Sequence, residues 1–174
     1  QPLLVVTDPD PVCEPFAADL TEAAITAGSD ADLQLSYWLD EEATQVLARP
    51  DSVTLTGIYY IRAENAGGCF AVEAVNVTIY DEPILVIADP APVCEPESVN
   101  LTEPFITAGS DSDLQLSYWL DADATQPLTR PDSVFASGVY FIGATNSEGC
   151  FVIKEVNVTI YSKPLLVVTD PAPV

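Results

Sequence analysis

The 174-residue sequence contains no histidine and only five basic residues, against 27 acidic ones. Without histidine, no side chain has an ordinary pKa suited to proton transfer near neutral pH, and the sequence shows no nucleophile motif. Paired carboxylates can serve glycoside hydrolysis. Here, however, acidic groups recur along the chain, which favours repeated structure over a single active site. The sequence therefore predicts a protein that is not an enzyme.

Positive charge is scarce, and the formal net charge is -22. Nucleic acids and anionic lipid surfaces are bound through lysine and arginine, which neutralise phosphate. The sequence has no apolar run long enough to span a bilayer and no signal peptide, although a segment taken from mid-chain would not contain a signal peptide. We expect no nucleic-acid partner and no membrane insertion by this segment.

The dominant feature is an internal repeat with a period of 81 residues and no insertions or deletions. It divides the chain into residues 1–81 and 82–162, and residues 163–174 replay the opening, KPLLVVTDPAPV against QPLLVVTDPDPV. The repeat relates the following pairs: Cys13 and Cys94, Trp38 and Trp119, Cys69 and Cys150. We predict two domains and the truncated first strand of a third repeat, in a segment of a longer periodic chain.

Each repeat reads as short strands bounded by Pro, Gly, Asp and Ser, without helical periodicity. Residues 3–7 predict an apolar first strand. Residues 33–40 alternate, with Trp38 on the face opposite Leu33, Leu35 and Tyr37. Residues 57–64 and 69–80 predict a hairpin around a Gly-Gly turn. Six or seven strands per repeat predict an all-β fold of tandem immunoglobulin-like β-sandwich domains joined end to end.

The motifs TDPAPVCEP, NLTEP.ITAGS, LSYWLDADATQPL, SGVYFI and VNVTIY follow one another in the chain. With these motifs, the sequence resembles the Ig-like tandem repeats of large Bacteroidetes cell-surface adhesins and gliding-associated proteins. The resemblance implies an extracellular, cell-surface location and a role as the structural stalk or filament region of an adhesin. Its partners would be neighbouring repeats of the same chain, with surface glycans or other cells as further candidates. It names no ligand.

Two alternative functions remain open. Each repeat could itself be a carbohydrate-binding module, because an exposed indole of Trp38 or Trp119 offers a flat face to a sugar. The competing interpretation packs these side chains in the core or beneath residues 43–47. Alternatively, the chain could be a filament subunit that donates the apolar strand 165–169 to another chain.

The four cysteines, Cys13, Cys69, Cys94 and Cys150, occur as two per repeat and do not suggest a metal site, because histidine is absent. Pairing within each repeat would close a loop and stabilise the domain by roughly 4 kcal/mol on the loop-entropy model. Such disulfides predict an oxidising, extracellular compartment. The alternative is reduced, buried cysteines in a cytosolic protein.

Acidic loops provide the candidate metal site, since calcium prefers carboxylate oxygens. The candidate ligands are Asp30, Asp32, Asp111 and Asp113, and calcium is the one cofactor considered; the alternative is a solvated acidic surface. Ser52 and Ser133 follow Asp in matching turns and are similar to the Asp-Ser-apolar acceptors of O-glycosylation in Bacteroidetes. The alternative is a turn serine that binds local backbone.

Overall fold

The computed structural model describes residues 1–168, and all regular elements within them are β-strands. The chain divides into two compact units, Gln1–Glu82 and Pro83–Val174. The division falls one residue after the end of the first predicted repeat. The repeat boundaries themselves, including a third copy from residue 163, stay a prediction.

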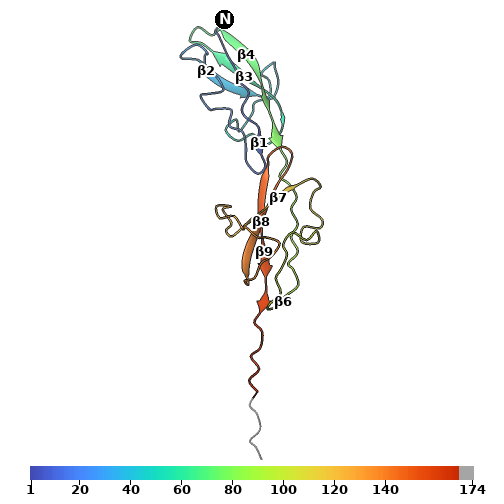
Figure 1. Cartoon of the computed structure of the whole chain (residues 1–174). Coiled ribbons are helices and arrows are strands. Elements are labelled where there is room, and N and C mark those ends of the chain that lie inside the picture. Colours follow the sequence, from blue (N-terminus) through green and yellow to red (C-terminus); the bar gives the residue numbers. More distant parts are fainter. Residues whose placement is uncertain (169–174) are drawn as a thin grey trace, which may run out of the picture. The chain divides into compact units, whose positions relative to one another are not determined.

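The first unit contains β1 (Val12–Cys13), β2 (Gln34–Trp38), β3 (Gly57–Glu64), β4 (Phe70–Val77) and β5 (Ile79–Tyr80). Strands β2, β3 and β4 form an antiparallel sheet in that order, and β1 pairs in parallel with β5 (Figure 1). The predicted β3–β4 hairpin is confirmed. Asn65 N–H donates to Cys69 O at 3.0 Å, and Gly68 adopts φ +78°, a left-handed conformation that glycine reaches without strain.

The second unit repeats this arrangement with β6 (Val93–Cys94), β7 (Gln115–Trp119), β8 (Gly138–Thr145), β9 (Phe151–Val158) and β10 (Ile160–Tyr161). Its antiparallel sheet has the order β7-β8-β9, and β6 pairs in parallel with β10. The register is also kept, because Tyr59 pairs with Val75 and Tyr140 with Val156. The internal repeat is thus a repeat of topology and of strand register.

The layer opposite each three-stranded sheet is largely irregular. In the first unit its pairing is one antiparallel bridge between Ala18 and Val53, whose backbone groups exchange hydrogen bonds of 2.8 and 2.9 Å. Val99 and Val134 form the same bridge in the second unit. In place of the expected six or seven strands, each unit has five strands and two isolated bridges, because much of the layer opposite the sheet is turn and loop.

A hydrophobic core lies between the two layers of each unit. Its buried members are at matching positions of the repeat, and a fully buried aliphatic side chain stabilises a fold by about 1.5–3 kcal/mol. The two sets are Ala18, Leu20, Ile25, Val53, Tyr59, Ile61, Val75 and Val77, and Val99, Leu101, Ile106, Val134, Tyr140, Ile142, Val156 and Val158.

A buried tyrosine near the start of β3 and of β8 adds a feature typical of immunoglobulin domains. The Tyr59 hydroxyl donates to Leu55 O at 2.9 Å, and the Tyr140 hydroxyl donates to Ala136 O at 3.0 Å. A tyrosine at this corner of an immunoglobulin sandwich bonds to backbone a few residues upstream in the same way. The predicted fold class, tandem immunoglobulin-like β-sandwich domains, is confirmed.

The predicted first strand, residues 3–7, is wrong in detail, because the segment joins no sheet. Side chains replace most of the ladder: Leu3 N–H donates to Asp30 Oδ2 at 2.8 Å and Val5 N–H to Ser29 Oγ at 2.9 Å. The short apolar run predicted a strand, but it could not show that two of its amide groups bind side chains about 25 positions away.

Candidate functional site

Trp38 lies at the end of β2, on the face opposite Tyr37, which packs against the core. The indole is half-buried, and its Nε1–H donates to Ser36 Oγ at 2.9 Å. The backbone of Trp38 bridges to Val46, a residue of the segment that was expected to cover it. The indole is therefore partly covered on the outer face of the sheet, and its role as a ligand platform stays a prediction.

A shallow pocket of about 550 Å³ adjoins Trp38. Arg62 lines it, with the guanidinium 4.3 Å from the centroid of the Phe70 ring and 2.6 Å from the Glu64 carboxylate. The rest of the lining comes from the loop after β2 and from β4, at Glu41, Glu42, Ala43 and Val72. Aromatic faces beside carboxylates can stack on a ring and accept hydrogen bonds from hydroxyl groups.

The same face of the second unit is built differently. Trp119 repeats the hydrogen bond, with Nε1–H donating to Ser117 Oγ at 2.8 Å. Gly143 stands at the position of Arg62, and a Cβ atom there would come within 2.5 Å of the Phe151 ring. The ring of Phe151 thus occupies the space over the glycine, and the arginine-centred pocket is particular to the first unit.

In the loop after each tryptophan, an aspartate side chain accepts hydrogen bonds from residues four and five positions later or from the first of these alone. Asp40 accepts hydrogen bonds from Thr44 Oγ1 at 2.6 Å and from Gln45 N–H at 2.6 Å. Asp121 accepts from Thr125 Oγ1 at 2.6 Å. Hydrogen bonds to the ionised form, led by the threonine hydroxyl, lower the pKa of both carboxyls. Sequence analysis missed this role, although an aspartate four residues before a threonine in both repeats was a usable signal.

The calcium candidates have a structural role. Asp30 Oδ2 accepts Leu3 N–H, and Asp111 Oδ2 accepts Ile84 N–H at 2.7 Å, so both hold the opening segment of their unit. Asp32 and Asp113 occupy turns with φ of 60° and 64°. Residues 1–168 contain no group of three or more acidic, cysteine or histidine side chains arranged to hold a metal. Calcium binding stays a prediction without a third ligand.

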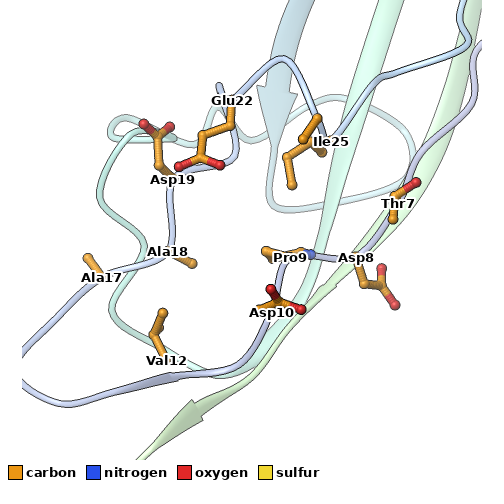
Figure 2. A pocket seen from close by; sticks show the side chains of 11 residues that line it. Thr7, Asp8, Pro9, Asp10, Val12, Ala17, Ala18, Asp19, Glu22 and Ile25 are labelled. Carbon is orange, nitrogen blue, oxygen red and sulfur yellow. The ribbon is translucent and has the colours of Figure 1, made fainter.

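Another pocket in the first unit, of about 390 Å³, is lined in part by acidic side chains. Figure 2 shows Asp19 and Glu22 side by side at its rim, Asp10 across from them, and Asp8 turned away. Asp8 accepts hydrogen bonds from Asn76 N–H and Nδ2, at 2.8 and 3.0 Å. The second repeat has alanine and asparagine at the positions of Asp10 and Asp19, so this acidic lining is not fully repeated.

Ser52 and Ser133 are half-buried in matching turns, where each N–H donates to the carbonyl of an arginine three residues earlier, at 3.2 Å. The structure therefore places both candidate glycosylation sites in the predicted turns. Modification of these serines stays a prediction.

The cysteines differ from the expectation of one disulfide inside each repeat. Cys69 and Cys94 are free thiols, and both are exposed. Cys13 and Cys150 are disulfide-bonded. The structure thus does not show pairing of Cys13 with Cys69 or of Cys94 with Cys150.

No protein-family model and no curated protein matches the sequence. Solved structures of immunoglobulin-domain tandems are similar at low identity. A fragment of titin, I67-I69, has a TM-score of 0.40 and 10% identity, covering 92% of this chain and 66% of that one. Extracellular domains 3–5 of Drosophila OTK have a TM-score of 0.43 and 15% identity, covering 92% of this chain and 62% of that one. Sidekick-1 immunoglobulin domains 1–4 have a TM-score of 0.40 and 12% identity, covering 91% of this chain and 48% of that one.

The chain spans less than two thirds of the length of each of these three structures. In residues 1–168, the structure contains no helix that is both long and apolar enough to cross a bilayer.

Proposed function

We propose that this chain is a structural repeat segment, a stalk or filament region, of an extracellular cell-surface adhesin. The observation that carries the proposal is the construction of the two units. Each has its own core, built from side chains at matching positions, and the same strand register. Units that repeat their interior this closely suit a load-bearing or spacing role.

The extracellular location is supported by chemistry within the chain. Cys13 and Cys150 are disulfide-bonded, and disulfides persist in oxidising compartments. The net charge of -22 favours solubility and weakens association with nucleic acid and anionic lipid. Two further parts of the proposal are supported by the sequence motifs alone. They are the origin from a bacterial cell surface and the glycosylation of Ser52 and Ser133.

Single-molecule force spectroscopy under reducing conditions tests the structural role. We expect two separate unfolding events, each lengthening the chain by somewhat less than about 28 nm, because an extended 81-residue unit spans roughly 3.3–3.6 Å per residue and the folded unit already spans part of that length. A single event that releases both units together, or extension without a force peak, would contradict independent load-bearing units. Replacing the buried Ile142 with alanine should lower the force of one event and leave the other as the internal control.

Carbohydrate binding is a second candidate, favoured by the pocket that joins Trp38 to Phe70 and Arg62. A panel of oligosaccharides can be titrated while tryptophan fluorescence is recorded. The candidate predicts a saturable change that Trp38→Ala abolishes and that Trp119→Ala leaves intact, because the second unit lacks the arginine-centred pocket. Saturable binding that survives Trp38→Ala would exclude this pocket as the site.

The segment from Lys163 is proposed to begin a third copy of the repeat. Leu166 corresponds to Leu4 and Leu85, which are 7% and 1% exposed, yet Leu166 is 84% exposed. The contrast is what a first segment without the core of its own unit would show. Residues 169–174 lie outside the described residues, so most of the expected donor strand 165–169 is seen and only its end is not. Donation of this segment to another chain remains the alternative, and a concentration-dependent dimer that disappears when residues 163–174 are removed would favour it.

A further inference from the structure

A groove of about 270 Å³ lies in the first unit, between the loop after β2 and the turn before β3. Its apolar lining includes Leu39, Leu47 and Leu55, and Leu39 and Leu55 are 47% and 71% exposed. Among the described residues that line it, Arg49 is the only charged one. We call it the Arg49 groove, because it combines exposed apolar side chains with one positive charge.

Backbone hydrogen bonds fix both walls of the Arg49 groove. In the loop after β2, Leu39 N–H donates to Gln45 O at 2.8 Å. In the turn that carries Arg49, Pro50 O accepts a hydrogen bond of 2.8 Å from Leu20 N–H. Leu20 is a member of the buried core, so this turn is anchored to the interior of the unit. A site whose walls are already in place loses little conformational entropy on binding.

The guanidinium of Arg49 is open to a ligand. The residue is exposed, and within residues 1–168 the structure gives its guanidinium neither an ion pair nor a hydrogen bond, although Asp51 is only two residues away in the sequence. A guanidinium offers five N–H donors in a planar fork that matches the two oxygens of a carboxylate. Arg49 can therefore bind an anionic group supplied by another molecule.

The repeat preserves this arginine. Arg49 and Arg130 are the only two of the five basic residues that are related by the 81-residue period. Arg130 is also exposed, and its turn is anchored in the same way, because Leu101 N–H donates to Pro131 O at 2.8 Å. The two units thus share one basic position, and each presents it on the same anchored turn.

We propose that the Arg49 groove docks an acidic segment of another polypeptide, with a carboxylate on the guanidinium and an apolar side chain between Leu39 and Leu55. Charge complementarity favours this partner, because the described lining contributes a cation and no carboxylate. The size also fits, since sites for drug-sized ligands measure about 300–1,000 Å³ and this groove is smaller. It therefore suits one anchoring side chain. The proposal adds a binding function to the structural role and does not depend on that role.

The charge of the chain restricts where such a partner can bind. With a net charge of -22, most of the surface repels an acidic segment. Arg62, the other arginine of the first unit, is already paired with Glu64. An apolar side chain seated in the groove adds buried contact area that a small anion lacks. The groove therefore selects for a partner that is both acidic and apolar.

Titration of the chain with a synthetic peptide, followed by NMR of the backbone amides, tests the proposal. Ser52 lines the same groove, so a glycan on this serine would compete with the peptide, and the 174-residue chain is used without glycosylation. The probe is acetyl-Glu-Asp-Phe-Glu-Asp-amide. We expect saturable shifts of the amide signals of Leu47, Ser52 and Leu55.

Two altered peptides separate the contributions of charge and of the apolar anchor. One has glutamine and asparagine in place of the four acidic residues, and the other has alanine in place of phenylalanine. The neutral peptide should bind at least about tenfold more weakly, because it cannot form charge-assisted hydrogen bonds with the guanidinium. The alanine peptide should also bind more weakly, because it leaves the apolar walls of the groove uncovered.

Variants of the two repeated arginines assign the site. Arg49→Gln should weaken binding of the acidic peptide at least about tenfold, since it removes the charge. Arg49→Lys should keep part of the affinity, because an ammonium retains the charge but not the planar fork. Arg130→Gln is the matched control and should leave the shifts in the first unit unchanged. Spectra recorded without peptide show whether each variant is folded.

Three results would overturn the proposal: no saturable shift at these amides, shifts that survive Arg49→Gln, or equal binding of the neutral peptide. Shifts of the same amides with protein concentration, in the absence of peptide, would place a second copy of the chain in the groove and would overturn a separate acidic partner. None of these results bears on the structural role, which the force measurement tests.

Discussion

The inner faces of the two units are built from the same positions, whereas their outer faces differ at the centre of the sheet. Ile61 and Ile142 are both fully buried. One position further along the same strands, Arg62 lies over Phe70, and Gly143 lies under Phe151. The comparison teaches that the interior of this repeat tolerates little change in volume. The outer face of the sheet, by contrast, accommodates either an arginine or a glycine at the same position.

The comparison can be made quantitative because each unit contains one tryptophan. With Trp119 replaced by phenylalanine, fluorescence of Trp38 reports unfolding of the first unit, and the reverse replacement reports the second. Urea unfolding under reducing conditions then gives a free energy of unfolding for each unit separately.

The largest expected effect comes from the shared core. Ile61→Ala and Ile142→Ala should each lower the free energy of unfolding of their own unit by about 2–5 kcal/mol, because each leaves a cavity at a fully buried position. Urea midpoints of the two units should fall by similar amounts. If one unit lost much more than the other, the equivalence of the two interiors would be wrong.

Gly143→Arg imposes the outer face of the first unit on the second. The new Cβ would lie 2.5 Å from Phe151 Cε2 and 2.6 Å from Ser117 Oγ, so the ring must move. We expect the second unit to lose about 1–2 kcal/mol, as overpacked sites do. The control is Phe151→Ala, in which the same arginine should cost clearly less. An equal cost in both backgrounds would show that the phenylalanine ring is not what the arginine displaces.

Arg62→Ala removes the charged centre of the outer face in the first unit. The arginine contributes a contact with the Phe70 ring and an ion pair with Glu64, both partly exposed. Each is worth about 0.5–1 kcal/mol or less at such sites. The first unit should lose about 1 kcal/mol in urea unfolding at low salt, and less at high salt. Loss that does not respond to salt would assign the effect to packing alone.

The smallest expected effect is on the loss of folding stability at low pH, in which the two units should behave alike. The folded-state pKa of Asp40 and of Asp121 lies below the ordinary value of 3.8, so their contribution to stability is present above that value. It is lost as the pH falls through the lowered pKa. Asp40→Asn and Asp121→Asn should each flatten the acid limb of stability against pH in their own unit. An unchanged acid limb in either variant would show that the hydrogen bonds from Thr44 or Thr125 do not favour the ionised carboxylate.

Local sequence patterns predicted the elements whose partners are close in the chain. The β3–β4 hairpin and the inward set Val75 and Val77 follow from alternation and from the Gly-Gly turn, since both depend on neighbouring residues. The outer-face position of Trp38 follows from the same alternation. The pocket beside Trp38 could not be predicted, because Arg62 and Phe70 come from two other strands.

The sequence by itself determined the repeat, the all-β class and the inward positions of the last long strand of each repeat, because periodicity and alternation of apolar residues are visible in one dimension. Only the tertiary structure decided that the two cysteines of one unit cannot meet. Two cysteines per 81 residues suggest a disulfide inside each domain, yet pairing depends on distance in space. Cys13 and Cys69 lie at opposite ends of one sheet, about 35 Å apart along nearly continuous strand, and a disulfide reaches less than about 7 Å.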